Sequence, residues 1–321
     1  MTRRGRTSIG LIGARGYVGG ELIRLAVGHP HLHVAFVSSR ALGGEEVASH
    51  VDGAPAGLRF TNLDESEVAA SQAEVIILAL PNGKARSFVA AIDASERPQR
   101  LILDISADYR FDGGWVYGLP ERFRDRIRGA RRISNPGCYA TAAQLAIAPM
   151  VDVLGGPPTV FGVSGYSGAG KTPSDKNNPE LLYDNLLPYS LTGHLHEREV
   201  SRHVGRAVHF LPHVAPFFRG ITMTVNMPLG KKITTEGMGK RYEHAYGREP
   251  LIKLTGDKPP LVRDIAGRHH VAIGGWCVAE NGERSAVVAT IDNLLKGAAT
   301  QAIQNVNLAC GFDELAGIPY E

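Results

Sequence analysis

The stretch Gly10-Leu-Ile-Gly13-Ala-Arg-Gly16-Tyr-Val-Gly19 decides the fold of the first half of the chain. It overlaps the end of a short apolar run, residues 8–12, and leads into a segment with helical spacing, residues 17–27. Glycines at such a junction let the backbone approach a pyrophosphate and aim the start of the helix at it. The stretch therefore predicts a dinucleotide site, with a merely tight glycine turn as the alternative.

Further apolar runs extend this start into an alternating pattern of strands and helices. Residues 33–37, 75–80 and 101–105 are typical of buried strands, and a helical stretch begins near Asn82. This alternation predicts a doubly wound parallel α/β sheet of the Rossmann type. After the second strand, Ser38-Ser39-Arg40 stands where NAD enzymes carry an acid, which favours NADP(H) over NAD; a surface arginine is the alternative. The expected cofactor contacts are Gly10, Gly13, Arg15, Gly16, Tyr17, Val18, Ser38, Ser39 and Arg40.

The second half of the chain has a different pattern of apolar and polar residues. From about Pro157 the apolar runs alternate with polar residues and are interrupted by two helical segments, which predicts an α+β domain with a largely antiparallel sheet. One face of that sheet is available for burial against another subunit, so we expect a homodimer or homotetramer. The expected division is an NADP-binding domain over 1–137, a catalytic and dimerisation domain over 138–292, and a C-terminal helix over 293–321 that returns to the first domain.

A tight turn places a cysteine at the mouth of a helix. In Ser134-Asn-Pro-Gly137-Cys138 the turn residues precede an Ala-rich helical run, so Cys138 is expected at the positive end of the helix dipole. That position lowers a thiol pKa and predicts a nucleophile; a buried structural cysteine is the alternative. His194 and His196 lie near a second predicted helix start and suit proton transfer, although a structural role stays open. Because no ordered set of further ligands accompanies them, we predict no metal site.

Composition limits the classes of protein to which this chain can belong. The 321 residues are 43% hydrophobic and 21% charged with a net charge of +3, which is typical of an ordinary globular protein and gives no reason to expect nucleic-acid or membrane partners. The three cysteines, Cys138, Cys277 and Cys310, are scattered and favour a reducing compartment. Residues 1–8 are too short for a targeting peptide, so we expect a cytoplasmic protein.

Six segments together carry a family resemblance that spans nearly the whole chain. The chain resembles the N-acetyl-γ-glutamyl-phosphate reductases, within the aspartate-semialdehyde dehydrogenase-like superfamily. The resemblance implies NADPH-dependent reductive dephosphorylation of N-acetylglutamyl 5-phosphate to the 5-semialdehyde through a cysteine thioester. The segments are Gly13-Ala-Arg-Gly-Tyr-Val-Gly19, Ser134-Asn-Pro-Gly-Cys-Tyr-Ala-Thr141, Gly162-Val-Ser-Gly-Tyr-Ser-Gly-Ala-Gly170, His194-Leu-His-Glu-Arg-Glu199, Pro212-His-Val-Ala-Pro-Phe-Phe-Arg-Gly220 and Asp292-Asn-Leu-Leu-Lys-Gly297.

The resemblance also implies roles for individual residues. Cys138 matches the family's nucleophile, and His194 stands at the place usually given the proton-transfer role. Many members carry a basic residue between the two histidines, whereas this chain has Leu195, which leaves the relative roles of His194 and His196 open.

The chemistry of an acyl phosphate suggests further candidates. The departing phosphate needs a cationic donor, for which Arg110 is the first choice, with a surface arginine as the alternative. Asn135 or Gln144 is expected to position the acyl group, and Glu199 is assigned to the substrate site. Asn293 and Lys296, at the start of the last helix, are expected at the far end of the dinucleotide, as is Gly168 from the glycine-rich segment.

Three other functions fit some of the same residues. A carrier-protein-linked aminoadipyl- or glutamyl-phosphate reductase shares nearly all of these motifs. A non-redox acyl transferase or hydrolase would use Cys138 and His194 alone. An NADP-sensing protein without catalysis would keep the glycine fingerprint, with structural roles for the cysteine and the histidines.

Overall fold

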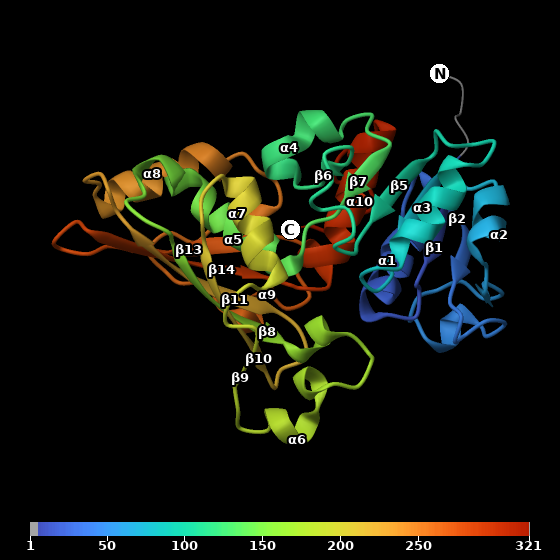
Figure 1. Cartoon of the computed structure of the whole chain (residues 1–321), viewed down its shortest axis with the longest axis horizontal. Coiled ribbons are helices and arrows are strands. Elements are labelled where there is room, and N and C mark those ends of the chain that lie inside the picture. Colours follow the sequence, from blue (N-terminus) through green and yellow to red (C-terminus); the bar gives the residue numbers. More distant parts are fainter. Residues whose placement is uncertain (1–5, 321) are drawn as a thin grey trace. The chain divides into compact units, whose positions relative to one another are not determined.

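The computed structural model describes residues 6–320 and divides the chain into two compact units (Figure 1). Unit 1 runs to Pro136 and resumes over Ala298–Pro319, and unit 2 covers Gly137–Gly297. Asn293 and Lys296 therefore belong to unit 2. Residues 1–5 and Glu321 lie outside the described residues. Residues 1–5 belong to the N-terminal segment in which we expect no targeting peptide.

Unit 1 is built on a seven-stranded sheet in the order β3-β2-β1-β4-β5-β7-β6. Every neighbouring pair is parallel, which confirms the predicted Rossmann-type sheet. The strand order reverses between β1 and β4, the place where such sheets bind ligands at their carboxyl ends. The strands are β1 (Thr7–Ile12), β2 (Leu32–Ser38), β3 (Phe60–Thr61), β4 (Val75–Leu78), β5 (Leu101–Asp104), β6 (Val116–Tyr117) and β7 (Arg132–Ser134).

Helices cover both faces of this sheet, which explains its continuous apolar strands. On one face, α1 (Tyr17–Val27) and the C-terminal α10 (Thr300–Cys310) share a core with Leu11 and Ile77. On the other, α2 (Glu65–Ala70) and α3 (Ala85–Asp93) share a core that contains Ile76. The remaining helix of unit 1 is α4 (Pro120–Ile127).

Unit 2 carries a second seven-stranded sheet, in the order β12-β13-β14-β11-β8-β10-β9. Most neighbours are antiparallel, as predicted, but β8 pairs with β10 and β12 pairs with β13 in parallel. A parallel pair needs a long connection, and the segment that contains α7 supplies it between β8 and β10. The strands are β8 (Thr159–Gly165), β9 (Leu187–Pro188), β10 (His209–Ala215), β11 (Ile221–Pro228), β12 (Ile252–Leu254), β13 (Val271–Val278) and β14 (Arg284–Ile291).

Two helices cover one face of this second sheet. The helix α5 (Cys138–Ile147) packs on β11 and β14, and α8 (Thr235–Tyr246) packs on β13. The alternation along β11 buries Met223 and Val225, whereas Thr224 is exposed between them. α7 (Leu195–Val204) packs beside α5. Two one-turn helices, α6 (Pro179–Leu182) and α9 (Val262–Ile265), complete the α-helices described in unit 2.

A buried carboxylate ends β5 and makes unit 1 sensitive to pH. Asp104 is fully buried and accepts hydrogen bonds from the amide and hydroxyl of Ser106. Burial raises the pKa of Asp104 to about 6 against an ordinary value of 3.8. The pKa of Asp104 is higher in the folded than in the unfolded protein, so protonation of this side chain favours the folded state. Its contribution to the free energy of unfolding is complete below pH 3.8 and is lost as the pH rises through about 6.

Replacing Asp104 by asparagine should remove this dependence of stability on pH while keeping the shape of the side chain. The free energy of unfolding of Asp104→Asn, relative to the parent protein, should increase by about 1 kcal/mol between pH 5 and pH 7. Urea denaturation at both pH values measures it, with the exposed Asp112→Asn as the matched control. A constant difference for Asp104→Asn would contradict the titration.

Candidate active site

Cys138 is the first residue of α5, directly after its N-cap residue Gly137. This confirms the expected position at a helix start, where first-turn amides have no partner within the helix and the dipole favours negative charge. Every other residue of α5 is buried, whereas Cys138 is partly exposed. The thiol is therefore the one group of α5 that presents surface to a reactant.

A carboxylate from α7 ties the cysteine helix to the histidines. Glu199 is fully buried, and its Oε1 accepts the amide of Gly137 at 2.9 Å. Its Oε2 lies 4.0 Å from Nε2 of His196. This carboxylate faces protein groups on both sides, and its expected contact with substrate stays a prediction.

His194 is the N-cap residue of α7 and has a defined tautomer. Its Nδ1 accepts the amide of His196 at 3.1 Å, so the neutral ring carries its proton on Nε2. Burial lowers the pKa of His194, and the positive charge of Lys176 lowers it further, against Glu197 and Glu199, which raise it. These contacts favour a neutral imidazole with one N–H to donate.

Aromatic rings surround His194. Its ring centroid lies 5.5 Å from that of Tyr189, 5.2 Å from Phe210 and 5.0 Å from His196. Tyr139, the neighbour of the cysteine, lies 6.5 Å from His194 and donates its hydroxyl to the carbonyl of His213 at 2.8 Å. Burial, and then the charge of Cys138, raises the pKa of Tyr189, so its hydroxyl stays protonated.

Sequence reasoning missed Tyr189. It stands in a segment without periodicity, and the pairing of β9 with β10 helps to place its ring beside that of His194. No signal in the sequence alone could have found it.

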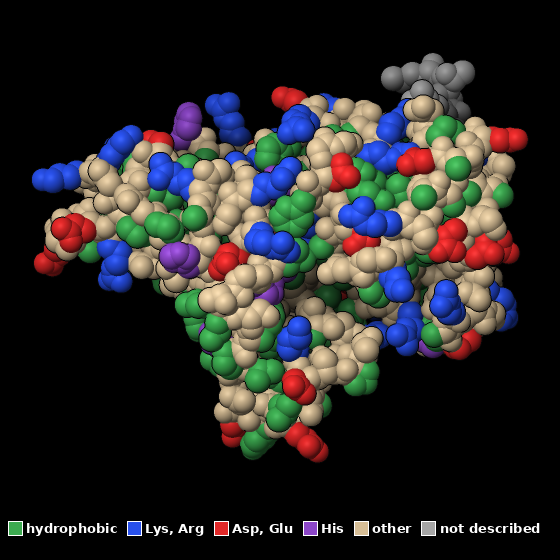
Figure 2. Space-filling model, viewed as in Figure 1, with side chains coloured by type: hydrophobic (Ala, Val, Ile, Leu, Met, Phe, Trp, Pro, Cys, Tyr) green, Lys and Arg blue, Asp and Glu red, His purple; other side chains and the backbone are tan. Residues whose placement is uncertain are grey.

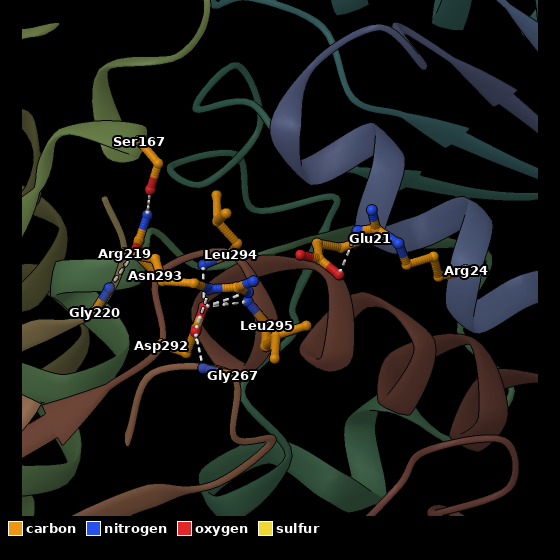
Figure 3. Close-up of polar contacts among 10 residues, drawn as sticks. All are labelled: Glu21, Arg24, Ser167, Arg219, Gly220, Gly267, Asp292, Asn293, Leu294 and Leu295. Carbon is orange, nitrogen blue, oxygen red and sulfur yellow. Dashed lines mark hydrogen bonds and ion pairs between the residues drawn. The ribbon is translucent and has the colours of Figure 1, made fainter. Parts of the chain in front are cut away.

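A buried carboxylate organises the loops beyond β14 (Figure 3). Asp292 is fully buried and accepts two hydrogen bonds from Arg219, at 2.6 Å from Nε and 3.0 Å from Nη2. It also accepts the amides of Gly267, Leu294 and Leu295 at 2.7, 2.9 and 3.1 Å. Five donors fix this carboxylate, so the chain that leaves β14 has a defined path.

The neighbouring amide holds two more loops. Asn293 accepts the amide of Gly220 through Oδ1 at 2.7 Å and donates through Nδ2 to the hydroxyl of Ser167 at 2.9 Å, as Figure 3 shows. Lys296 is fully buried, whereas Gly168 is exposed. The cofactor contacts expected of Asn293, Lys296 and Gly168 stay predictions.

Gly297 lies directly against the nucleophile. It belongs to the π-helical turn Leu295–Ala299, and its amide donates to the carbonyl of Asp292 at 2.9 Å. A Cβ atom at position 297 would lie 2.8 Å from Cβ of Cys138 and 3.0 Å from the carbonyl oxygen of Asp292. Although the motif that ends in Lys296-Gly297 was noted, sequence reasoning did not assign this contact.

In unit 1 the glycine segment has the backbone that a dinucleotide loop needs. Gly13 has φ +84°, and a Cβ there would lie 2.2 Å from the carbonyl oxygen of Ala79. The amides of Gly13 and Ala14 donate to the carbonyl of Ser38, and Gly16 is the N-cap residue of α1. At Gly16 the nearest atom to an added Cβ would be 3.8 Å away, so the helix start is open to a phosphate.

The segment after β2 is divided between buried and exposed residues. Ser38 and Ser39 are buried, and the hydroxyl of Ser38 accepts the amide of Leu63 at 3.0 Å. Arg40 is exposed, which fits the expected contact with a 2′-phosphate. At Gly10 an added Cβ would overlap the ring of Phe36, and the expected cofactor contact of this residue stays a prediction. Arg15 is exposed, and Tyr17 and Val18 begin α1.

Three expected substrate ligands are engaged with protein groups. Arg110 donates through Nε to the carbonyl of Asn135 and through Nη2 to that of Ile105, both at 2.9 Å. Asn135 is fully buried and accepts from Asn305 at 3.0 Å. Gln144 is also fully buried and donates to Ala140 in its own helix. Their contacts with substrate stay predictions.

Charged side chains and possible metal ligands were compared with this site. Figure 2 shows basic and acidic side chains interspersed on one face of the molecule. Among residues 6–320, no group of three or more His, Cys, Asp or Glu side chains is placed to hold a metal ion. Within the same range, no helix has the length and apolar character needed to cross a membrane.

Comparisons with known proteins define the class. A family described as "Semialdehyde dehydrogenase, NAD binding domain" matches residues 8–130, and "Semialdehyde dehydrogenase, dimerisation domain" matches 138–293. Aspartate semialdehyde dehydrogenase II from Vibrio cholerae shares the fold with a TM-score of 0.76, at 19% identity over 96% of this chain and 99% of that one. The Candida albicans enzyme, solved with NADP, gives 0.69 at 15% identity over 95% and 99% of the two chains. The fold and the two family matches define an oxidoreductase of the semialdehyde dehydrogenase type.

Curated relatives narrow this class. A protein named N-acetyl-gamma-glutamyl-phosphate reductase from Xanthomonas campestris is 62% identical over 97% of this chain and 98% of its own length. Proteins of the same name from Stenotrophomonas maltophilia and Xylella fastidiosa are 58% and 57% identical over 98% of this chain, and the match covers 98% and 95% of their own lengths. The chain belongs to the N-acetyl-γ-glutamyl-phosphate reductase family.

Proposed function

We propose that this protein catalyses the NADPH-dependent reductive dephosphorylation of N-acetylglutamyl 5-phosphate to N-acetylglutamate 5-semialdehyde. The observation that carries the proposal is the hydrogen bond from Gly137 to Glu199, which ties the helix that begins with Cys138 to the helix that carries both histidines. A nucleophile and a proton donor on two linked helices suit acyl transfer. The identity of the substrate is inferred from the name of the curated relatives.

Cys138 performs the first step. Its thiolate attacks the acyl carbonyl carbon, the C–S bond forms, and the bond from carbon to the phosphate oxygen breaks so that inorganic phosphate leaves. The amides at the start of α5 stabilise the negative oxygen of the tetrahedral species. The thioester that remains accepts hydride far more readily than a carboxylate would.

His194 handles the proton in the second step. Its Nε2–H donates to the carbonyl oxygen of the thioester as negative charge develops there. NADPH, when bound, supplies the hydride. The oxyanion that this N–H stabilises then collapses as the C–S bond breaks, which releases the aldehyde and restores the thiolate of Cys138. His196, near Glu199, orients His194 through its backbone amide.

Unit 1 provides the residues that would hold the cofactor. The open start of α1 at Gly16 suits the pyrophosphate, and the exposed Arg40 suits the 2′-phosphate that distinguishes NADP from NAD. Gly13 keeps the loop close to β4. No disulfide joins the three described cysteines, which fits the cytoplasmic location included in this proposal.

The reverse reaction tests the proposal most directly. Purified protein with N-acetylglutamate 5-semialdehyde, phosphate and NADP⁺ should form NADPH, measured by absorbance, and should do so poorly with aspartate semialdehyde. Omission of phosphate is the control, because the thioester then has no acceptor. Absence of phosphate-dependent NADPH formation with the acetylated substrate would refute the proposal.

The open face of the second sheet is our proposed contact with a second copy. Phe161 of β8 is 39% exposed on it, and it is paired across the sheet with the exposed Thr224, which is paired in turn with Val288. Burial against a second copy would stabilise the apolar side chains of Phe161 and Val288 in this row. The matching family's description as a dimerisation domain supports a homo-oligomer.

A charge on this face should break the oligomer. Phe161→Glu would bury an unpaired carboxylate, so sedimentation velocity at micromolar concentration should show monomers where the parent protein sediments as a dimer or tetramer. Leu181→Glu, at a residue 44% exposed on α6, is the matched control and should leave the oligomer intact. A monomeric parent protein, or dissociation only in the control, would contradict this interface.

A further inference from the structure

A lysine that no sequence motif singled out lies beside the proposed proton donor. Lys176 belongs to the 3-10 turn Asp175–Asn177, and its Nζ lies 4.7 Å from the ring centroid of Tyr189. The ring of Tyr189 is in turn 5.5 Å from that of His194. The ammonium thus stacks on the aromatic ring that borders the histidine, a geometry that holds a cation without using its N–H donors.

The fold keeps Lys176 in this place from both sides. Asn177 donates to the carbonyls of Gly170 and Thr172 at 2.9 and 2.8 Å, which anchors the turn to the glycine-rich segment after β8. On the other side, the amide of Tyr189 donates to the carbonyl of Pro212 at 3.2 Å, next to the pairing of β9 with β10. Lys176 is half-buried, and no carboxylate described in residues 6–320 pairs with it.

A second observation places the charge within reach of the reacting groups. The pKa of His194 is lowered first by burial and then by the charge of Lys176. A half-buried cation without a carboxylate, next to a neutral imidazole, attracts an anionic ligand. The substrate of the proposed reaction carries two anionic groups, a carboxylate and the phosphate of the acyl phosphate.

We propose that Lys176 binds an anionic oxygen group of the substrate, held over the ring of Tyr189 and beside His194. The proposal rests on the proposed function for the identity of the substrate. Its chemistry, a lysine ammonium donating to a carboxylate or phosphate oxygen, is the same for both groups, and the two sources are separated by experiment. It adds a substrate-binding residue from the segment between β8 and β9, where only Gly168 had been assigned, and that to the cofactor.

The kinetic test uses Lys176→Met in the reverse assay. Loss of the ammonium should raise the KM of one reactant about tenfold while kcat changes less than about threefold, and Lys176→Arg should restore most of the affinity. A higher KM for phosphate alone identifies the phosphate as the ligand of Lys176. A higher KM for the semialdehyde alone identifies the carboxylate as the ligand. In the second case, preference over 4-acetamidobutanal, which lacks the carboxylate, should also disappear. Unchanged KM values would overturn the proposal.

A binding test separates this inference from the proposed function. Alkylation of Cys138 by iodoacetamide, followed by mass spectrometry, should be slowed by inorganic phosphate or by N-acetylglutamate in the parent protein, and about tenfold more anion should be needed in Lys176→Met. Cys277, which is exposed, reports intrinsic reagent reactivity, and Lys232→Met, at an exposed lysine of unit 2, is the control. Equal protection in the parent and Lys176→Met would overturn the assignment whether or not the reductase reaction is observed.

Discussion

Cys138→Ser should abolish phosphate-dependent reduction, with kcat/KM falling on the order of 10³-fold or more and NADPH affinity unchanged. A serine hydroxyl is a far weaker nucleophile at neutral pH, and an ester accepts hydride less readily than a thioester. The substitution replaces one atom at the start of α5, so the fold should persist. Steady-state kinetics and NADPH fluorescence titration measure the two halves of the prediction.

Cys277→Ser is the matched control, because Cys277 is exposed in the same unit. It should retain the parent kcat/KM. An active Cys138→Ser protein would exclude the thioester route, whereas loss of both activity and NADPH binding would indicate a folding defect.

Gly297→Ala should lower kcat by about tenfold to a hundredfold, because a small displacement of a reacting atom is costly. The added methyl group would lie 2.8 Å from Cβ of Cys138, and the backbone carbonyl of Asp292, at 3.0 Å, leaves it little room to retreat. Five hydrogen bonds hold Asp292 in place, so the cysteine rather than the turn should move. Reaction of Cys138 with iodoacetamide should change in rate as well.

Gly156→Ala provides the comparison for this variant. An added Cβ at Gly156 meets only an ordinary contact, 3.7 Å from the side chain of Pro228. It should match the parent in kcat, in alkylation rate and in thermal midpoint. Parent values of kcat and alkylation rate for Gly297→Ala would show that Gly297 does not position the nucleophile.

Local patterns in the sequence predicted much of the fold. The helix 17–27 has the predicted bounds, because its periodicity lies within the segment itself. The parallel pairing of β8 with β10 was not predicted. Pairing direction depends on the connection between strands, and the part of that connection before α7 has no regular pattern.

For the site, the sequence by itself determined the chemistry of single positions: a cysteine at the start of α5, two histidines at the start of α7, and a glycine loop before α1. These depend on turn and cap residues that are neighbours in the chain. Only the tertiary structure decided which groups meet, namely Glu199 with Gly137, Gly297 with Cys138, and Lys176 with Tyr189. The physical reason is that such contacts join residues far apart in sequence, and packing and hydrogen bonding, which local patterns do not encode, set their geometry.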